Sequence, residues 1–446
     1  MSPWEKFAND WRGKKVLIMG LGIQGGGAQV AHIFSKAGAV VTVTDLRTAE
    51  TLKDSIKSLD GLSIRFMLGA HHADDFVSQD LIIRNPGVSE LSPFLQVARE
   101  HQIPIKMETA LFTKYAHNKT IGITGTRGKS TTSHLVAHIL KTAGRNVVLA
   151  GNLPGRAALP LLKSISKAQD VVLELSSWQL QGFRDEKISP HISVITSLYP
   201  DHLNRYASMK EYIRDKTYIF KFQTPLDYII LNKDNPQVVK LADQVTSQLI
   251  WFSHRDLPED FVLKIPGIHN RENAAAAMAI CKLMDVSDEQ ILRSLATFTG
   301  VPYRLETIAN INGVEIINDT TSTTPVATVK ALEAITKPIT LIIGGESKNL
   351  PTDQLIEAVN ARVKKVVLLS GSGTAEIKPA LQKTLIITET KDLPTAVAAG
   401  LENTKSGGTL LFSPGFTSFG LFLNEFDRGK EFNKIVKQLS HDQTPA

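Results

Sequence analysis

Cysteine is almost absent from this sequence: its 446 residues include one, Cys281, in the apolar stretch AAAAMAICKLM. A single cysteine excludes a disulfide framework within the chain and a cysteine-based metal site. The apolar surroundings of Cys281 predict a buried thiol and not a nucleophile. Because a chain without disulfides suits a reducing compartment, we expect a cytoplasmic protein.

Long hydrophobic runs are missing as well. The N-terminal segment MSPWEKFANDWRGKK has no hydrophobic signal core. No later apolar run reaches the roughly 18 residues that a membrane-spanning helix needs. The sequence therefore predicts no membrane span, and any contact with a membrane would be peripheral.

Charge of one sign is not concentrated in any segment. Lysine and arginine are spread along the chain, the net charge is +6, and charged residues make up 21% of the sequence. This pattern indicates no nucleic-acid surface, although it favours anionic small substrates. The hydrophobic content of 42% fits a soluble globular enzyme. A chain of this length predicts about three domains.

The most informative segment that is present is IGITGTRGKSTTSHL, residues 121–135. A short apolar strand leads there into a glycine-broken loop and then into a helix, which predicts a phosphate-binding site. Gly125 and Gly128 would let backbone N–H groups turn inward, Lys129 would reach the outer phosphates, and Ser130 would ligate Mg²⁺. The spacing departs from the usual P-loop, because Ile123 stands where the first glycine belongs. The alternative is an ordinary strand-to-helix turn with a chance Lys-Ser pair.

Residues 1–108 are predicted to form a first, Rossmann-like domain. A strand at Lys15 to Gly20, the loop GLGIQGG, a helix at Ala28 to Ala37 and the strand AVVTVTD make a βαβ unit. Gly20, Gly22 and Gly25 form G-x-G-x-x-G, and Asp45 follows at the distance of a ribose-binding acid. NAD and other nucleotides both fit this pattern. The turn Asn85-Pro86-Gly87 ends another strand at the edge where such sheets bind ligands.

Residues 109–300 are predicted to form a central, P-loop-type ATPase domain with a mostly parallel sheet. The strand in DVVLELSSWQL ends at Glu174, whose lone carboxylate is costly in apolar sequence unless a metal or a partner compensates it. A structurally paired carboxylate is the alternative. The segment HISVITSLYPDHLNRY brings Asp201 and His202 to the same edge. Asn270 and Asn273 lie in the first helical turn after GIHNREN begins, as capping groups or as contacts to a base.

Lys216 lies on the otherwise apolar face of a predicted helix, MKEYIRDKTYIF. A lysine in such a stripe usually extends its ammonium group to solvent, and the pattern alone favours that interpretation.

Residues 301–446 are predicted to form a third, Rossmann-like α/β domain. It begins at Val301-Pro302, has a hairpin that turns at Asn312-Gly313, and continues through a hydroxyl-rich loop into a helix that starts at Pro325. Four more strands alternate with helices. Lys348 and Ser418 follow strands at the ligand edge of this predicted sheet.

Across nearly its whole length the chain resembles the Mur ligase family, which comprises ATP-dependent amide ligases of peptidoglycan assembly. GTRGKSTT, DHLNRY, GIHNREN and PYRLE resemble motifs found throughout that family, and NDTTSTTP resembles its ND(S/T)xAT loop. ELSSWQL and SPGFTSFGLFLNEFDRGKEF resemble motifs of the branch that adds glutamate to UDP-N-acetylmuramoyl-L-alanine. The resemblance implies this activity, which proceeds through an acyl-phosphate intermediate. It also implies that the G-x-G-x-x-G loop binds the uridine nucleotide of the substrate and not NAD. It is also compatible with a monomer that has no nucleic-acid partner.

The resemblance assigns residues to each ligand. ATP would be held by Gly125, Thr126, Arg127, Gly128, Lys129, Ser130, Thr131, Asn270, Asn273, Arg304 and Asp319. The UDP-linked substrate would be bound by Ile23, Gln24, Asp45, Arg47, Asn85, Gly87, Asn152 and Ser176, and glutamate by Thr323, Lys348 and Ser418. One Mg²⁺ ion would be held by Ser130 and Glu174, and a second by His202 and Lys216. The catalytic residues would be Lys129, Glu174, His202, Lys216 and Arg304.

Lys216 corresponds in this resemblance to a lysine that such ligases carbamylate with CO₂, which replaces a cation by a carboxylate-like metal ligand. That role contradicts the solvent-exposed interpretation.

Three positions depart from the family pattern. Arg127 stands where asparagine is commonest, and Thr321 replaces a lysine associated with the incoming glutamate. Glu425-Phe426 reverses the usual order of an aromatic residue and a glutamate. These departures make the added amino acid the least supported part of the assignment.

Other functions remain open at this point. The nearest alternative is another Mur-type ligase that adds a different amino acid, and folylpolyglutamate synthase is a more distant one. A nucleotide-binding relative without catalysis and an NAD-dependent dehydrogenase belong to different classes. The sequence shows no evident hydride-transfer site for the dehydrogenase.

Overall fold

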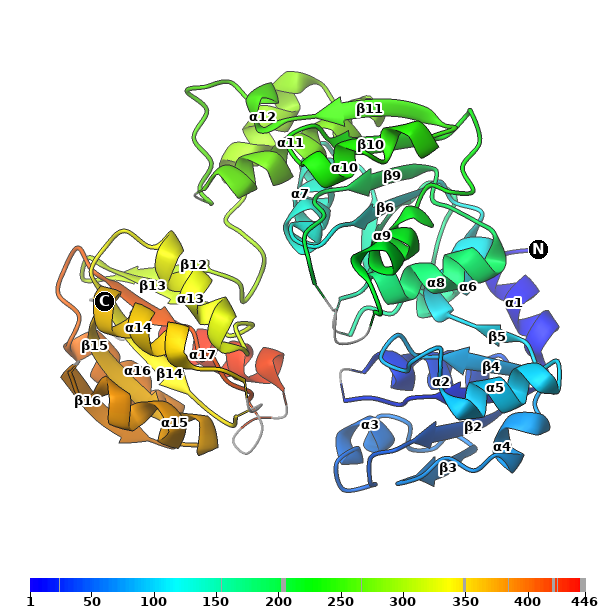
Figure 1. Ribbon diagram of the computed structural model, residues 1–446, viewed down its shortest axis with the longest axis horizontal. Coiled ribbons are helices and arrows are strands. Elements are labelled where there is room, and N and C mark those ends of the chain that lie inside the picture. Colours follow the sequence, from blue (N-terminus) through cyan, green and yellow to red (C-terminus); the bar gives the residue numbers. More distant parts are fainter. Residues whose placement is uncertain are drawn as a thin grey trace. The chain divides into compact units, whose positions relative to one another are not determined.

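The computed structural model describes residues 1–23, 25–153, 155–201, 206–265, 267–347, 350–383, 385–418, 422 and 424–441. Three of the predicted site residues, Gln24, His202 and Lys348, lie outside these residues. The described residues contain three sheets, and Figure 1 labels most of their strands and helices.

The first sheet is parallel, in the order β3-β2-β1-β4-β5. Its strands are β1 (Lys15–Met19), β2 (Val40–Asp45), β3 (Ile64–Leu68), β4 (Leu81–Arg84) and β5 (Ile105–Lys106). Its helices are α1 (Pro3–Trp11), α2 (Gly26–Lys36), α3 (Lys53–Lys57), α4 (Asp74–Val77) and α5 (Pro93–Glu100). Val16 and Ile18 of β1 pack into one core with α2, whereas Leu17 and Met19 pack into another with Leu95 of α5. Apolar side chains on both faces explain why β1 is a continuous hydrophobic run.

The central sheet is also parallel, in the order β11-β10-β9-β6-β8-β7. Its strands are β6 (Thr120–Thr124), β7 (Val147–Gly151), β8 (Asp170–Glu174), β9 (Ile192–Ile195), β10 (Tyr228–Asn232) and β11 (Gln248–Phe252). Its helices are α6 (Glu108–Ala116), α7 (Lys129–Thr142), α8 (Ser177–Glu186), α9 (Met209–Thr217), α10 (Pro236–Val239), α11 (Ile268–Leu283) and α12 (Asp288–Thr297). Short 3₁₀ turns are η1 (Leu159–Lys163), η2 (Ala242–Gln244) and η3 (His254–Asp256). Because the strands are parallel, the loops after β6, β8 and β9 meet at one edge.

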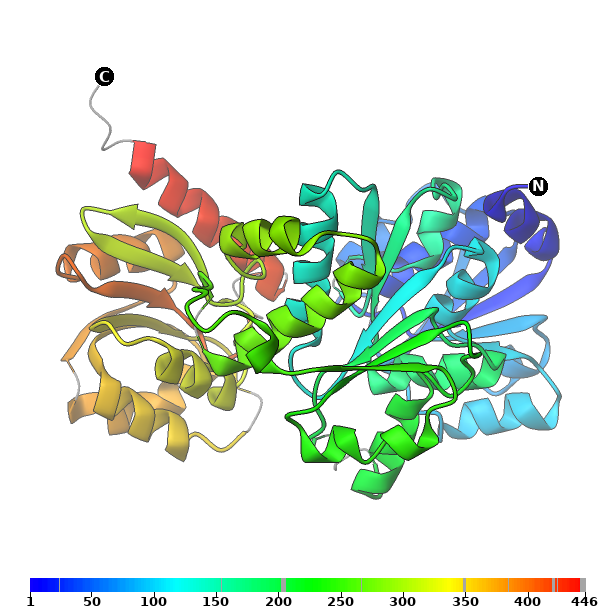
Figure 2. The ribbon, with the colours of Figure 1, turned by 90° about the horizontal axis from the view of Figure 1, so that it is seen from above.

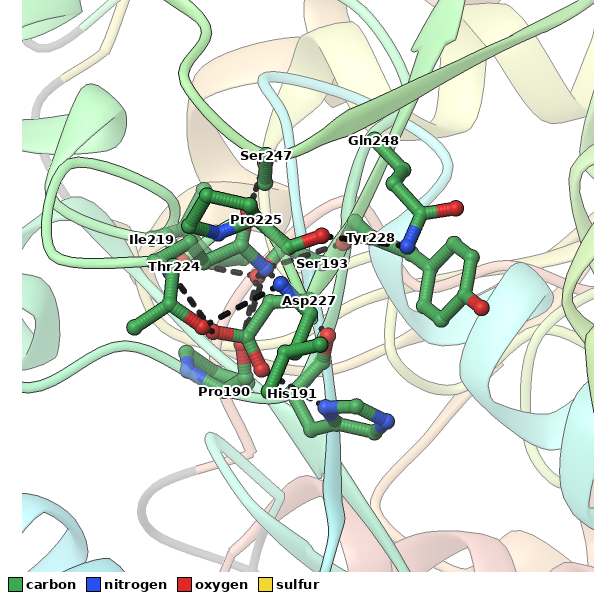
Figure 3. Close-up of polar contacts among 12 residues, drawn as sticks. Pro190, His191, Ser193, Ile219, Thr224, Pro225, Asp227, Tyr228, Ser247 and Gln248 are labelled. Atoms are coloured by element: carbon green, nitrogen blue, oxygen red, sulfur yellow. Dashed lines mark hydrogen bonds and ion pairs between the residues drawn. The ribbon is translucent and has the colours of Figure 1, made fainter.

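The opposite edge of the central sheet is held by a buried amide. Gln223 Nε2 donates hydrogen bonds to the carbonyl oxygens of Pro190 (2.8 Å) and Tyr228 (2.9 Å) and to Ser193 Oγ (3.1 Å). Gln223 Oε1 accepts from Ser247 Oγ at 2.7 Å. Figure 3 shows these partners, which lie at or just before the beginning of β9, β10 and β11. The network fixes the end of the sheet that faces away from the phosphate loop.

The third sheet has the order β12-β13-β17-β14-β15-β16. Its strands are β12 (Glu306–Ile311), β13 (Val314–Asn318), β14 (Ile339–Gly344), β15 (Val363–Leu369), β16 (Leu385–Thr390) and β17 (Thr409–Phe412). Only the β12–β13 pair is antiparallel among these described strands, and its turn at Asn312-Gly313 confirms the predicted hairpin. The helices are α13 (Pro325–Ala334), α14 (Asp353–Arg362), α15 (Ser372–Ile377), α16 (Leu393–Glu402) and α17 (Glu425–His441), with the 3₁₀ turn η4 (Lys378–Lys383). Helix α17, red in Figure 2, packs on α16 and β12.

The chain forms two compact units. The first contains Met1–Leu263 and Ile268–Phe298, with the first two sheets, and the second contains Lys264–Gly267 and Thr299–Ala446, with the third. The predicted α/β class with mostly parallel sheets is confirmed. The domain limits 1–108, 109–300 and 301–446 stay predictions. No helix in the described part of the chain is long and apolar enough to cross a membrane.

Candidate functional site

The phosphate loop connects β6 to α7, as predicted. Gly125 has φ +152° and Gly128 has φ +86°, values that strain residues with a side chain. A Cβ atom on Gly125 would lie 2.0 Å from Thr196 Oγ1, and one on Gly128 would lie 2.3 Å from Asn273 Oδ1. Both positions therefore require glycine for two reasons, the backbone conformation and the space.

Ser197, which follows β9, shapes the middle of this loop. Its carbonyl oxygen accepts from the Thr126 N–H at 2.7 Å, and its Oγ accepts from the Arg127 N–H at 3.0 Å. The backbone is thus fixed in front of the N-terminus of α7, which has no side-chain cap among the described residues. An uncapped helix N-terminus presents N–H donors and positive potential to an anion. The side chain of Arg127 is exposed, and nothing in the structure explains its departure from the family pattern.

Lys129 begins α7, and its ammonium group bends back over the loop. Lys129 Nζ donates to the carbonyl oxygens of Gly125 (2.9 Å) and Thr126 (3.1 Å). Ser130 and Thr131 follow in the same helical turn and are half-buried. A cation and two hydroxyl groups are therefore gathered at the positively polarised end of one helix.

Glu174 ends β8 beside β6, paired with Ile123 two residues before the loop begins. Its side chain is buried, with 1% of the residue exposed. Glu174 Oε1 accepts a hydrogen bond from Asn152 Nδ2 at 2.9 Å, but Oε2 has no hydrogen-bond partner in the described part of the chain. A buried carboxylate oxygen in this state is unfavourable, and a bound cation would compensate it. The structurally paired alternative accounts for one oxygen only.

Ser176 has a local structural role. Its Oγ accepts from the Gln179 N–H at 3.2 Å, and Gln179 Oε1 accepts from the Ser176 N–H at 3.0 Å. This reciprocal pair is a capping box that starts α8 directly after Glu174.

Lys216 does not extend to solvent, so the interpretation from the helical pattern alone is wrong. It is 1% exposed, and its Nζ donates to the carbonyl oxygen of Gly125 at 2.9 Å. The ammonium group also lies 4.7 Å from the ring centroid of Tyr212, one helical turn earlier. Burial, followed by the positive charge of Lys129, lowers the pKa of Lys216 well below its usual value. A lysine with a lowered pKa is more readily neutral and nucleophilic.

Three residues that contribute to this site were not predicted as site residues. Thr196 and Ser197 hold the phosphate loop, and Tyr212 Oη lies 3.1 Å from Thr126 Oγ1. The sequence carried a signal for each: the two hydroxyl residues follow a strand of the same parallel sheet, and Tyr212 lies four positions before Lys216.

Asn273 lies beside the phosphate loop on α11. Its Oδ1 accepts from Thr132 Oγ1 at 3.3 Å, and its Nδ2 donates to Asn270 Oδ1 at 3.3 Å. The structure thus brings both predicted adenine-contacting residues to the first turns of α11, close to the start of α7.

The glycine loop of the first sheet is closed by Asp45. Asp45 Oδ2 accepts from the Gly22 N–H at 3.0 Å, and Oδ1 accepts from the Arg47 N–H at 2.9 Å. The Arg47 guanidinium lies 3.6 Å from Asp45 Oδ2. Asp45 therefore shapes the loop that contains Ile23, in addition to any contact with a ribose.

The turn after β4 packs against the same loop. Asn85 Nδ2 donates to the Gly20 carbonyl oxygen at 3.3 Å, and the Gly87 N–H donates to Asn85 Oδ1 at 3.1 Å. Two predicted substrate-binding segments that are 65 positions apart in sequence thus meet at one sheet edge.

In the second unit, Asp319 is the centre of a buried hydrogen-bond network. Its Oδ2 accepts from Ser322 Oγ (2.6 Å) and Ser413 Oγ (2.7 Å), and its Oδ1 accepts from the Leu305 N–H (3.0 Å). Burial raises the pKa of Asp319 to about 6, although these hydrogen bonds oppose the shift. Arg304, its neighbour in the predicted ATP-binding set, is exposed.

Of the predicted glutamate-binding residues, Thr323 directly follows Ser322 of this network. Ser418 is buried, and Thr323 lies beside Ser347, Gly415 and Phe416 around one small depression. Lys348 follows Ser347 in sequence but lies outside the described residues, as do His202 and Gln24.

The described residues combine a glycine loop in front of an uncapped helix N-terminus with a buried carboxylate and a buried lysine, on a three-sheet α/β chain. Family models agree with this architecture: the "Mur ligase MurD-like, N-terminal domain" matches residues 14–106, the "Mur ligase middle domain" residues 123–264, and the "Mur ligase, glutamate ligase domain" residues 303–416. The chain belongs to the Mur ligase family.

Relatives named UDP-N-acetylmuramoylalanine--D-glutamate ligase (MurD) match almost the whole chain. The protein from Roseiflexus sp. (strain RS-1) is 38% identical and aligns with 96% of this chain and 99% of its own length. The protein from Geobacter sp. (strain M21) is 35% identical over 96% of this chain and 98% of its own. The predicted family membership is confirmed.

Solved structures share the fold at lower identity. The UDP-N-acetylmuramate-alanine ligase MurC from Thermotoga maritima has a TM-score of 0.60 and 19% identity, with 96% of this chain and 100% of that one covered. The E. coli FolC structure in complex with ADP has a TM-score of 0.54 and 15% identity over 75% of this chain and 93% of its own. These likenesses confirm the three-domain α/β architecture.

Proposed function

We propose that this chain is an ATP-dependent amide ligase that adds D-glutamate to UDP-N-acetylmuramoyl-L-alanine in peptidoglycan synthesis. The observation that carries the proposal is that Lys129 and Lys216 both donate to the Gly125 carbonyl oxygen, while Glu174 ends the neighbouring strand opposite Ile123. Relatives that bear this activity in their names support the substrates. We also propose a cytoplasmic monomer; the single cysteine, which is buried, supports the compartment.

The reaction would proceed by carboxylate activation. An oxygen of the alanyl carboxylate attacks the γ-phosphorus of ATP, the bond to the β-phosphate oxygen breaks, and ADP leaves. The glutamate amine then attacks the acyl carbon, loses a proton, and inorganic phosphate leaves as the amide forms. Positioning and neutralisation of charge supply most of the rate in such transfers.

The chain's own residues would perform the following tasks. The N-terminus of α7 and Lys129 neutralise the outer phosphates, and the turn at Gly128 brings the backbone close to them. Asn270 and Asn273 contact adenine, whereas Arg304 and Asp319 contact phosphate and ribose.

We propose that a divalent cation binds beside Glu174. The buried Oε2 without a described partner is an oxygen ligand of the kind that Mg²⁺ prefers, and Ser130 would supply a second. A second ion would be held by His202 and carbamylated Lys216. When bound, Mg²⁺ would supply charge neutralisation at the phosphates.

Lys216 is proposed to be carbamylated. Because burial lowers the pKa of Lys216, its ammonium group loses a proton more readily, and the neutral amine can attack the carbon of CO₂ with loss of one further proton, which gives a carbamate anion. Because its Nζ lies at the Gly125 carbonyl oxygen, the new anionic group would form at the phosphate loop.

Different segments of the chain are proposed to bind the UDP group, the muramoyl-alanine part and glutamate. We propose that Ile23, Gln24, Asp45, Arg47, Asn85 and Gly87 bind the UDP group, with Asn152 and Ser176 near the muramoyl-alanine part. Thr323, Lys348 and Ser418 are proposed to bind glutamate.

An assay of phosphate release tests the proposal. The purified chain is given Mg²⁺, ATP, UDP-N-acetylmuramoyl-L-alanine and, in turn, a panel of D- and L-amino acids. We expect release with D-glutamate well above all others. Preference for another amino acid would indicate a different Mur-type ligase, and no release with any amino acid would indicate a non-catalytic relative.

A further inference from the structure

Three buried polar side chains connect the end of β4 to the helix that carries Lys216. Arg84 ends β4, Gln181 lies on α8, and Asp215 precedes Lys216 on α9. Arg84 Nη2 donates to Gln181 Oε1 at 2.8 Å, and Gln181 Nε2 donates to Asp215 Oδ2 at 2.6 Å. The three residues are 3%, 4% and 0% exposed, respectively. We call this set the Arg84–Gln181–Asp215 relay.

The chemistry of the relay allows one amide orientation. A guanidinium group can only donate hydrogen bonds, and an ionised carboxylate can only accept them. Gln181 must therefore turn its oxygen to Arg84 and its nitrogen to Asp215. The amide links a buried cation to a buried anion that do not bond directly to each other in the structure.

Both ends of the relay lead to segments of the proposed active site. Arg84 Nη1 donates to the Val88 carbonyl oxygen at 2.8 Å and so holds the turn that contains Asn85 and Gly87. At the other end, Asp215 is the direct neighbour of Lys216. Helix α8, which begins after Glu174, lies between these two segments and is bonded to both.

Stability alone does not explain such an arrangement. Burying ionic groups costs desolvation free energy, and apolar residues of similar size are often at least as stabilising. Buried polar networks instead fix one geometry, since their bonds are directional. The relay joins the proposed UDP-binding turn to the Lys216 helix, where a displacement of about 1 Å is enough to slow the reaction.

We propose that Arg84, Gln181 and Asp215 are positioning residues for the ligase reaction, which hold the turn at residues 85–88 and the Lys216 helix in a fixed relation to α8. The inference rests on the proposed function, because it takes that turn to bind the UDP-linked substrate and Lys216 to act in carboxylate activation.

The test compares two buried glutamines in the full-length chain. Gln181→Met keeps the side-chain volume and removes both bonds of the relay. Gln223→Met is the matched control, because it removes a buried amide network at the opposite edge of the central sheet (Figure 3). Steady-state phosphate release and the melting temperature are measured for both.

We expect Gln181→Met to lower kcat at least about tenfold and to raise KM for the UDP-linked substrate several-fold, with KM for ATP nearly unchanged. Gln223→Met should lower the melting temperature and leave kcat and both KM values within about twofold. Equal kinetic effects of the two variants would overturn the inference, because a general loss of stability would then explain both.

Two variants of Asp215 provide an independent readout. Asp215→Asn keeps an oxygen that can accept from Gln181 Nε2, whereas Asp215→Leu does not. We expect Asn to restore most of the kcat that Leu loses, and equal activities would count against the relay. An unmodified chain without activity would overturn the proposed function, and this inference with it, whereas an active chain with a fully active Gln181→Met variant overturns the inference alone.

Discussion

Glu174 and Asn152 form a hydrogen bond that uses half of a buried carboxylate. Asn152 Nδ2 donates to Oε1 at 2.9 Å, and Oε2 is left without a hydrogen-bond partner among the residues that the structure describes. The pair lies at the C-terminal edge of the central sheet, where β7 and β8 end side by side. A bound cation would compensate the buried oxygen that has no described hydrogen-bond partner.

Glu174→Gln is expected to reduce kcat by about a hundredfold or more, since it removes the proposed anionic Mg²⁺ ligand. Its melting temperature without ligands should equal or exceed that of the unmodified chain, because a buried, half-satisfied carboxylate becomes a neutral amide. Phosphate release measures kcat, and calorimetry with and without MgATP measures the melting temperature. The stabilisation by MgATP should shrink in the variant. A fully active Glu174→Gln chain would contradict the proposed metal site.

Lys216→Ala is expected to be almost inactive and to regain activity when short carboxylates such as formate or acetate are added. The added anion would occupy the space of the carbamate and replace its charge. Phosphate release over a series of carboxylate concentrations measures the rescue. Lys210→Ala, on the exposed side of the same helix, is the control and should keep its activity without any addition. Absence of rescue would favour a role for the amine itself.

Gly128→Ala is expected to weaken ATP binding at least about tenfold, because the new Cβ would collide with Asn273 Oδ1 and the backbone has φ +86°. Gly144→Ala is the matched control: its φ is +80°, but no atom lies within 4 Å of the added Cβ. Backbone strain should cost each variant about 1 kcal/mol of stability or more, and the collision with Asn273 adds to that loss in Gly128→Ala only. Titration calorimetry measures the affinity for ATP, which should fall in Gly128→Ala and stay unchanged in Gly144→Ala.

Asp319 is expected to make stability depend on pH between about 4 and 6. Its pKa in the folded chain is raised to about 6 from the usual 3.8, chiefly by burial, so the folded state binds more protons than the unfolded state in this window. The contribution of Asp319 to the free energy of unfolding is therefore full below pH 4 and is lost as the pH rises towards 6. Denaturant unfolding of the chain and of Asp319→Asn at several pH values measures the difference. A difference that does not change with pH would contradict the raised pKa.

Ser418→Ala and Lys348→Ala are expected to raise KM for glutamate several-fold while KM for ATP changes little, since both side chains are proposed to bind a glutamate carboxylate. Loss of the buried Ser418 hydroxyl should have the smaller effect, because a neutral hydrogen bond is weaker than one from a cation. Thr321→Lys, which restores the family residue, tests whether that departure weakens glutamate binding. Equal activity of both alanine variants and the unmodified chain would end the assignment.

Local sequence was sufficient for the elements and for several pieces of the site. Continuous apolar runs predicted the buried parallel strands, the glycines predicted the phosphate loop, and Asn312-Gly313 predicted the hairpin turn. Cys281 is buried, as its apolar surroundings indicated. These features depend on residues that are close in the chain, so periodicity and turn chemistry determine them.

Tertiary structure decided which polar groups meet. The helical stripe of Lys216 suggested an exposed ammonium group, but its partner, the Gly125 carbonyl oxygen, lies 91 positions away and was invisible to a local pattern. The same holds for Ser197 at the phosphate loop and for the bond between Arg84 and Gln181, which spans 97 positions. The sequence by itself determined strands, turns and the presence of a phosphate loop, because these follow from short-range geometry. Burial of Lys216 and the Glu174 oxygen without a described partner arise only when distant strand ends are brought to one edge of the central parallel sheet, since solvent is excluded there by segments of the first unit that lie far apart in the sequence.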